Sequence, residues 1–414
     1  MRSAVRSSTS STNRDGFSSH TQNWLSSTNV SDRRALGQYM TPEAIRRILL
    51  DQVELRPGMK VLDPSVGTGE FLREAQNRCP EVNAVGWDID PKVLDAARLN
   101  VPAAELHERD ALAEWTGDSF DLVIGNPPFF QFSASSDIRA KYAPVISGRP
   151  NIFALFFMAS LSVLKPNGTL AFVVPTSMNT GAYFESLRQY ITSVSSVEAI
   201  ISVPESDHFL DAQTSVQIIV LKKGPPNDRF VFRKSQPESN YSRTIFCVDP
   251  QRLESTFIGA KTVWELGYSV HTGTVVWNQA RERLYSSMVP NSIRLLWAHD
   301  ISESGEISLE PLNLKPGWIT DTSPETGPAI IVNRIVGSVG NARIRAATVP
   351  EGFKFVGENH VNVIVARPGA SQLCGYQRLR DALIDPAIAS KVMSITGNTQ
   401  LSASELCYLL PVHV

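Results

Sequence analysis

The residues best suited to chemistry form the segment Asn126-Pro127-Pro128-Phe129, which directly follows an apolar run ending at Gly125. Two consecutive prolines cannot continue a strand, because neither has a backbone N–H, so they fix the shape of the loop and leave carbonyl oxygens free as acceptors. An amide oxygen, a rigid carbonyl and an adjacent aromatic ring can together hold a planar amine. The segment therefore predicts an amine-binding site, and a plain strand-ending turn is the alternative.

A glycine-containing turn, Asp63–Phe71, is the second candidate segment. Its glycines let the backbone approach a ligand closely, but the third glycine of a dinucleotide fingerprint is missing, because Leu72 stands there. Asp63 would repel a phosphate and would suit a positively charged ligand. The turn therefore favours S-adenosylmethionine, which has an ammonium and a sulfonium group and no phosphate, over NAD.

Two further aspartates follow apolar runs. Asp88 stands about 20 residues beyond the glycine turn, where a carboxylate would accept hydrogen bonds from ribose hydroxyls. Helix capping is the alternative role, but Asp90, which Pro91 follows, suits a cap better. Asp110 could accept from the adenine amino group of the cofactor, although a solvated aspartate in that position is also common.

These four segments are positioned by a regular alternation of apolar runs and helical patterns, which predicts an α/β fold with a mostly parallel sheet covered by helices on both faces. Ligands of such sheets bind at the carboxyl ends of the strands, where the candidate segments fall. Strands are predicted at Met59–Asp63, Asn83–Asp88, Glu105–Asp110, Phe120–Gly125, Thr169–Val174, Val197–Val203 and Ser215–Lys222. The intervening helices are predicted at Glu70–Asn77, Pro91–Leu99, Asn151–Leu164 and Ala182–Thr192.

Composition limits the classes of protein that remain. The 414 residues carry 39 Lys and Arg against 41 Asp and Glu, so a globally basic nucleic-acid coat is excluded while a local basic face is not. The four cysteines form no CxxC pair, so we expect neither a metal site nor a disulfide framework. Residues 1–30 are rich in Ser and Thr and are predicted to be a disordered tail. No apolar run is long enough to span a membrane, so we expect no membrane partner.

The motifs resemble, in type and order, those of the gamma-class adenine-N6 DNA methyltransferases. The likeness rests on Gly37-Gln38-Tyr39-Met40-Thr41-Pro42, Asp63–Phe71, Asp88, Asp110 and Asn126–Phe129, and the sheet pattern extends it to about residue 222. More loosely, Leu314–Trp318 and Asn359–Val361 resemble segments of the TaqI-like specificity domain.

The resemblance implies a class I S-adenosylmethionine-dependent methyltransferase fold with a seven-stranded, mostly parallel sheet at 31–225, and an α+β DNA-recognition domain at 230–414. It implies methyl transfer from S-adenosylmethionine to the exocyclic N6 of adenine in duplex DNA, with the target base flipped out of the helix. The implied cofactor-binding residues are Thr41, Asp63, Pro64, Gly67, Gly69, Phe71, Asp88, Ile89, Asp110 and Ala111. The implied catalytic residues are Asn126, Pro127, Pro128 and Phe129, with Phe129 and Phe209 stacking on the target base.

The second half offers weaker signals. Arg334, Arg343, Arg345 and Lys354 are candidate DNA contacts, although ordinary solvated charges explain each of them equally well. The tryptophans Trp264, Trp277, Trp297 and Trp318 are expected to be core residues rather than stacking platforms.

Three alternatives remain beside a DNA methyltransferase of a restriction-modification system. Enzymes that methylate a protein glutamine amide or a ribosomal RNA base also use Asn-Pro-Pro followed by an aromatic residue, and the chain could be an inactive DNA-binding subunit. The preferred reading implies duplex DNA as the partner, a restriction endonuclease acting separately on the same site, and a monomer in the cytoplasm of a bacterial or archaeal cell.

Overall fold

The computed structural model describes residues 16–113, 119–148, 150–203, 215–312, 314–334, 343–396 and 401–414. The chain divides into two compact units. The first takes in the chain as far as Met178, with Ala182–Val231 and Phe246–Val248. The second comprises Asn179–Gly181, Phe232–Ile245 and Asp249–Val414. Across the described ranges, no helix has the length and apolar character needed to cross a membrane.

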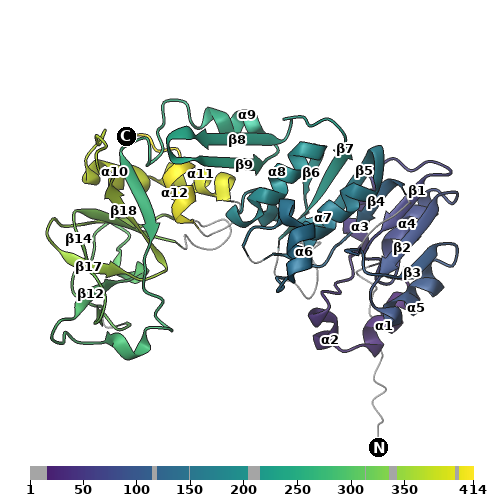
Figure 1. Ribbon diagram of the computed structural model, residues 1–414, viewed down its shortest axis with the longest axis horizontal. Helices are drawn as coiled ribbons and strands as arrows, with labels where there is room; N and C mark the ends of the chain where they lie inside the picture. The colour runs from purple at the N-terminus through teal and green to yellow at the C-terminus, as the bar shows by residue number, and fades with distance from the viewer. Residues whose placement is uncertain are drawn as a thin grey trace, which may run out of the picture. The chain divides into compact units, whose positions relative to one another are not determined.

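A single seven-stranded sheet organises the first unit, with strand order β3-β2-β1-β4-β5-β7-β6 (Figure 1). Within this sheet β7 runs antiparallel to its neighbours β5 and β6, and the other pairs are parallel. The predicted class I methyltransferase fold is confirmed by this order. The strands are β1 (Lys60–Asp63), β2 (Asn83–Asp88), β3 (Glu105–Glu108), β4 (Phe120–Gly125), β5 (Leu164–Pro175), β6 (Ser195–Ser202) and β7 (Val216–Lys223).

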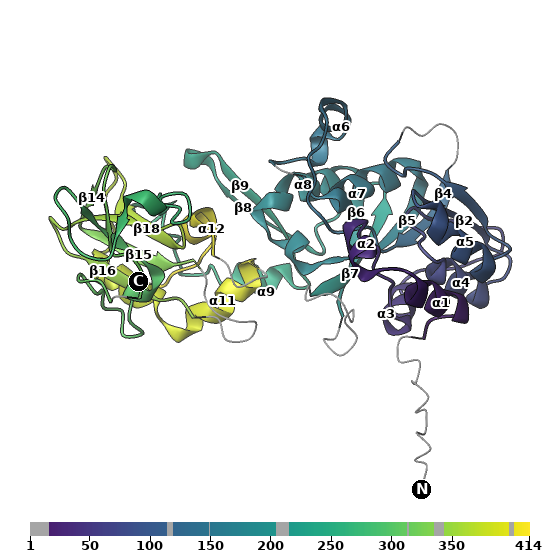
Figure 2. The same ribbon diagram turned by 90° about the horizontal axis from the view of Figure 1, so that it is seen from below.

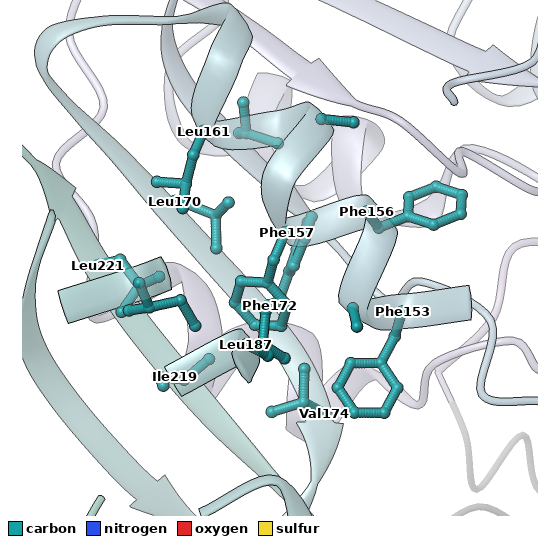
Figure 3. Packing of buried hydrophobic residues seen from close by; sticks show 14 of the residues in the cluster. Phe153, Phe156, Phe157, Leu161, Leu170, Phe172, Val174, Leu187, Ile219 and Leu221 are labelled. Atoms are coloured by element: carbon teal, nitrogen blue, oxygen red, sulfur yellow. The ribbon is translucent and has the colours of Figure 1, made fainter. Parts of the chain in front are cut away.

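Helices cover both faces of the sheet, because alternate residues of its strands are apolar on both sides. Leu170, Phe172 and Val174 of β5 pack against the helices α7 and α8 (Figure 3), whereas Ala171 and Val173 belong to the core on the opposite face. Figure 2 shows α3 and α4 on one side of the strands and α7 and α8 on the other. The helices of this unit are α1 (Ser19–Ser27), α2 (Val30–Ala35), α3 (Glu43–Leu50), α4 (Glu70–Arg78), α5 (Pro91–Asn100), α6 (Ser136–Lys141), α7 (Ile152–Val163) and α8 (Glu185–Val194).

The predicted disordered tail is wrong for the part of residues 1–30 that the structure describes. Residues from Gly16 onward are placed, and α1 forms because the Ser18 side chain accepts from the Thr21 backbone N–H at 3.1 Å and caps it. Trp24, 8% exposed, packs on Val93 and Ala96 of α5. Ser and Thr enrichment therefore reflects caps and buried hydroxyls here rather than disorder. The remainder of the predicted tail, residues 1–15, lies outside the described residues.

The described part of the second unit is built mainly of antiparallel strands, with α-helices beside them. One sheet has the order β10-β18-β15-β16, a second has β11-β13-β12-β17-β14, and β8 pairs with β9. Its strands are β8 (Val231–Gln236), β9 (Tyr241–Phe246), β10 (Tyr268–Thr272), β11 (Leu284–Tyr285), β12 (Ile293–Leu296), β13 (Trp318–Ile319), β14 (Glu325–Thr326), β15 (Ala329–Asn333), β16 (Ala346–Val349), β17 (Lys354–Gly357) and β18 (Val361–Ala366). Its helices are α9 (Pro250–Ser255), α10 (Tyr376–Leu383), α11 (Pro386–Thr396) and α12 (Ala403–Tyr408).

Candidate active site

A cavity of about 240 Å³ lies at the carboxyl ends of β1, β2 and β4, where the strand pattern placed the chemistry. Segment 36–41, which precedes α3, and the first turns of α7 complete its wall. Of the residues predicted to serve the cofactor or the reaction, those lining the cavity are Thr41, Asp63, Pro64, Gly67, Phe71, Asp88, Ile89, Asp110, Ala111, Asn126 and Pro128. The fold therefore brings together segments that are far apart in the chain, as the contact between Tyr39 and Asn126, 87 residues apart, shows.

The lining of this cavity is acidic. It includes the carboxyl groups of Asp63, Glu70, Asp88 and Asp110 and the single guanidinium of Arg109. Such a wall disfavours a phosphate-bearing ligand and suits a cationic one. The donor set therefore fits S-adenosylmethionine, whose ammonium and sulfonium groups are positive, and does not fit a dinucleotide.

Asp63 ends β1 and is the most deeply placed of these acids, at 1% exposed. Burial, opposed by the hydrogen bond from the Ser65 backbone N–H and reinforced by the nearby Asp88 carboxylate, raises the pKa of Asp63 to about 8. Gly125 at the end of β4 lies so close that a Cβ built there would be 2.7 Å from Asp63 Oδ1. A buried acid with a raised pKa in a cavity marks a functional site, because a cationic ligand would relieve the cost of ionising it.

Asp88 joins the glycine turn to the end of β2. Its Oδ2 accepts from the Gly67 backbone N–H at 2.9 Å, and its Oδ1 accepts from the Asp90 backbone N–H at 3.0 Å. Burial is the largest influence on Asp88 and raises its pKa. The helix-capping role predicted for Asp90 is confirmed, because Asp90 caps α5 by accepting from the Lys92 backbone N–H at 3.0 Å.

The cavity mouth carries Asp110 and Ile89. One carboxylate oxygen of Asp110 accepts from the Leu112 backbone N–H at 2.8 Å, which orients the exposed side chain and leaves its second oxygen available. Ile89 is 64% exposed, although an isoleucine beside a cavity would ordinarily be covered. An open aliphatic surface next to an aligned carboxylate is suited to the face and the amino edge of an adenine ring.

Asn126 is held through one end of its side chain only. Its Nδ2 donates to the backbone carbonyl of Tyr39 at 3.2 Å, which identifies the amide orientation, since an oxygen could not donate there. Its Oδ1 is buried and has no hydrogen-bond partner among the described residues. A buried unpaired acceptor costs about 1–3 kcal/mol, so its presence beside a cavity indicates a ligand that donates to it.

Three of the described residues predicted to serve the cofactor or the reaction lie outside the cavity lining. Gly69 caps α4 at φ +84° and faces Val101, so its role is close helix packing. Pro127 is buried, but among the described hydrogen bonds none uses its carbonyl oxygen. Phe129 packs edge-on against Phe153, with 6.0 Å between ring centroids. Phe209 lies outside the described residues.

The aromatic ring of this loop that lines the cavity is instead that of the next residue, Phe130. Ile152 and Phe156 from α7 line the cavity beside it, and sequence reasoning had missed all three. The doubled phenylalanine after the prolines and the aromatic start of the next helix were the available signals. Which ring faces the ligand depended on how the loop packs.

Sequence reasoning also missed a buried polar network that includes the lining residues Thr41 and Glu70. Arg46 is fully buried and donates to the Thr41 carbonyl at 2.6 Å, and its guanidinium lies 3.4 Å from the Glu70 carboxylate. Glu70 in turn accepts from the Thr21 hydroxyl at 2.6 Å and from the Ser18 backbone N–H at 2.9 Å. Helix α1, the start of α4 and the Thr41 segment are therefore joined through one carboxylate.

The second-unit residues predicted to contact DNA divide into two groups. Arg334 and Arg345 donate to backbone carbonyls of Asn359 and Ile301, at 2.9 and 3.2 Å, which gives both guanidinium groups a structural partner. Arg343 and Lys354 are exposed. In the described ranges, no cluster of three or more His, Cys, Asp or Glu could bind a metal ion.

Comparisons with known proteins show that the chain is similar to methyltransferases. A type II methyltransferase, M.CvrRI from Paramecium bursaria Chlorella virus XZ-6E, is 26% identical over 275 residues, which cover 66% of this chain and 69% of that protein. The type II methyltransferase M.TthHB8I from Thermus thermophilus is 31% identical over 170 residues, 38% of this chain and 39% of that protein.

Among solved structures, one from Listeria monocytogenes described as a class I S-adenosylmethionine-dependent methyltransferase aligns with a TM-score of 0.43 and 25% identity. It covers 50% of this chain and 68% of its own. The fold assignment above rests on strand order rather than on this partial likeness. The family model described as N-6 DNA Methylase matches residues 13–244, more than half of the sequence and the whole of the seven-stranded sheet. The chain therefore belongs to the N-6 DNA methylase family.

Proposed function

We propose that the chain is a site-specific DNA methyltransferase that transfers a methyl group from S-adenosylmethionine to the N6 of adenine in duplex DNA. The observation that carries the proposal is the unpaired, buried Oδ1 of Asn126 beside an acidic cavity. The curated relatives named above are type II methyltransferases, which supports DNA as the substrate. Membership of the N-6 DNA methylase family supports adenine N6 as the acceptor.

The residues of the site promote methyl transfer by positioning the target amine and by electrostatic interactions with it. When bound, S-adenosylmethionine supplies a methyl group on a positively charged sulfur. The exocyclic amine of adenine is a poor nucleophile, because its lone pair is delocalised into the ring. Asn126 Oδ1 accepts one amine hydrogen, and the Pro127 carbonyl, which has no partner among the described hydrogen bonds, accepts the other. Two such acceptors hold the nitrogen near tetrahedral geometry, which frees its lone pair for attack.

Asparagine cannot serve as a base at neutral pH, so the proton leaves after transfer, when the amine nitrogen is cationic and acidic. The rings of Phe130 and Phe156, which line the cavity, provide the apolar wall for the flipped base. Stacking on one such ring contributes about 1–3 kcal/mol, comparable to the few kcal/mol that flipping costs.

The proposed subclass is supported by the N-terminal motif. Segment 37–42 meets the catalytic loop through the Tyr39 carbonyl, and a Cβ at Gly37 would lie 2.8 Å from Pro128. This dependence of the Asn-Pro-Pro loop on an N-terminal segment supports assignment to the gamma class with a TaqI-like arrangement. The second unit then serves as the target-recognition domain.

As the modification enzyme of a restriction-modification system, the chain would work as a cytoplasmic monomer, with a separate endonuclease cutting the same unmethylated site. Its second unit supplies a DNA-recognition domain in the same chain. The alignments reach 69% and 39% of the two relatives' lengths, so these properties of a whole protein are part of the proposal.

The test is methylation by the purified chain. Incubation with S-adenosylmethionine and DNA from a methylation-free host, followed by nuclease digestion and mass spectrometry, is expected to yield N6-methyladenine. Single-molecule sequencing of the same DNA should place the mark at one recognition sequence. Methyl groups found on cytosine, on RNA or on protein glutamine instead would replace the proposal with one of the alternatives.

A further inference from the structure

A second hollow of about 340 Å³ lies in the second unit and is lined by Trp277, Arg281, Leu284, Trp297, Lys315 and Pro316. We call it the indole groove. Its residues come from three strand ends of one sheet: Arg281 precedes β11, Trp297 follows β12 and Lys315 precedes β13. Sequence analysis expected both tryptophans in the core, which is wrong for Trp277, because that side chain is 37% exposed.

The groove is rigid on one side. Trp297 is 3% exposed, belongs to the core of the five-stranded sheet, and donates through its indole N–H to the Pro316 carbonyl at 2.9 Å. Lys315 places its ammonium 4.5 Å from the Trp297 ring centroid and 5.6 Å from that of Trp277. The position of Lys315 is therefore fixed by two aromatic rings rather than by an acid.

The groove is also positively charged. No carboxylate lines it, and neither Arg281 nor Lys315 forms an ion pair with any described acid. Arg281 lies 5.1 Å from the Trp277 ring centroid. The Lys315 ammonium also acts on the neighbouring His299, which stacks on Trp297: burial lowers the pKa of His299, Asp300 opposes this, and Lys315 lowers the pKa further.

An exposed indole, two unpaired cations and the apolar surfaces of Leu284 and Pro316 together define the chemistry of the occupant. A bare phosphate would leave the apolar surfaces unused, and an apolar peptide would leave the cations unpaired. A nucleotide satisfies both, because its base is flat and its phosphate is an anion.

We propose that the indole groove binds one unstacked nucleotide of DNA, with the base on Trp277 and the adjacent phosphates on Lys315 and Arg281. The proposal rests on the proposed function, in which the second unit reads DNA. It assigns that contact to residues other than Arg334 and Arg345, whose guanidinium groups are bonded to backbone carbonyls.

The test compares two single-stranded oligonucleotides of equal length and charge, one of thymidine and one abasic, by fluorescence anisotropy with the full chain. Wild type is expected to bind the thymidine strand more tightly, and Trp277→Ala should lower that affinity between about 5-fold and 100-fold while leaving the abasic strand unchanged. Trp277→Phe should restore much of the preference. Lys315→Ala should keep the preference and reduce the slope of log affinity against log salt by about 0.7, the value for one single-strand phosphate contact.

Lys261→Ala, which removes an exposed cation elsewhere in the same unit, is the matched control and should bind both strands as wild type does. Unchanged S-adenosylmethionine affinity and melting temperature will show that each variant is folded. Equal binding of both strands by wild type, or a preference that survives Trp277→Ala, overturns the groove assignment. Methylation of duplex DNA is measured separately. If the wild-type chain transfers no methyl group but still prefers the thymidine strand in a way that depends on Trp277, only the proposed function is contradicted.

Discussion

The side-chain amide of Asn126 donates to the backbone carbonyl of Tyr39 at 3.2 Å, across 87 residues of sequence. This bond decides which end of the amide faces the cavity. It leaves Oδ1 as the unpaired acceptor and makes the N-terminal segment part of the catalytic loop's support. Because the contact uses a main-chain oxygen, no side chain at position 39 is needed for it.

Replacing Asn126 with alanine should reduce methyl transfer by at least about 10²–10³-fold, the usual cost of removing one oriented polar group from a transition-state site. S-adenosylmethionine affinity should stay within about three-fold of wild type, as measured by isothermal titration calorimetry. Asn83→Ala, which alters an exposed asparagine on β2, is the control. Loss of cofactor binding in Asn126→Ala would show that Asn126 holds the cofactor rather than the target amine.

Asp63→Asn should stabilise the protein and weaken cofactor binding. The folded-state pKa of Asp63, about 8, lies above its ordinary value of 3.8. The favourable contribution of Asp63 to the free energy of unfolding is therefore complete below pH 3.8 and is lost as pH rises toward 8. Asparagine keeps the acceptor for the Ser65 backbone N–H without the charge. We expect a gain of about 1–2 kcal/mol in unfolding free energy at pH 8. Chemical denaturation at pH 5 and pH 8 will measure it, and a gain that fails to grow with pH would contradict the assignment.

Cofactor binding should depend on pH through the same carboxyl group. Below pH 8 the free protein holds Asp63 largely protonated, whereas a bound cation needs the carboxylate, so binding releases a proton. Affinity should rise by up to about ten-fold per pH unit between pH 6 and 8 and then level off. Calorimetry in two buffers of different ionisation enthalpy counts the released protons. A flat affinity across this range in wild type would argue against contact between Asp63 and a cation.

Gly125→Ala should damage the cavity. At φ +154° the added methyl group would lie 2.7 Å from Asp63 Oδ1, which must then shift. We expect at least a ten-fold loss of S-adenosylmethionine affinity, measured by fluorescence or calorimetry. Gly375→Ala, where the new methyl group would meet nothing within 4 Å, serves as the control. Normal affinity in Gly125→Ala would mean that the β1 and β4 ends are less tightly juxtaposed than described.

Arg46→Met should destabilise the protein by about 1–3 kcal/mol, because it leaves the Thr41 carbonyl without its donor and removes one of two arginines from the Glu70 carboxylate, which keeps Arg73 at 2.7 Å. The neighbouring Arg47→Met provides a matched control, since that side chain is 64% exposed and should change unfolding free energy by less than about 0.5 kcal/mol. Thermal and urea unfolding will compare them. Equal effects of the two substitutions would contradict a structural role for the Arg46–Glu70 pair.

The sheet and the carboxylates at its strand ends could be predicted, because both are encoded in local patterns. Strand β4 begins and ends at the predicted residues, and α4 and α5 end within one residue of prediction. Strand β5 was predicted to begin at Thr169 but begins at Leu164, which already pairs with Phe120. A turn signal in Lys165–Gly168 hid this early start, because pairing with a neighbouring strand overrides local turn preference.

The identity of several site residues could not be predicted. Phe129 and Phe130 are adjacent and chemically equal, yet Phe129 packs on Phe153 while Phe130 lines the cavity. Helix α1 looked like a disordered tail, because its stability comes from Glu70 and α5, far along the chain. Trp277 resembled any core tryptophan, and its exposure depends on how three strand ends meet.

The order of motifs and the periodicity of apolar residues determined the fold and the edge of the sheet at which a ligand binds. They also determined which residue types are available at that edge, because all of these follow from backbone geometry and side-chain burial within short stretches of sequence. The tertiary structure decided which atoms face the cavity, which charges are buried together and which oxygen of the site is left without a partner. Those outcomes depend on contacts between residues distant in sequence, and a single chain's local pattern carries no record of such contacts.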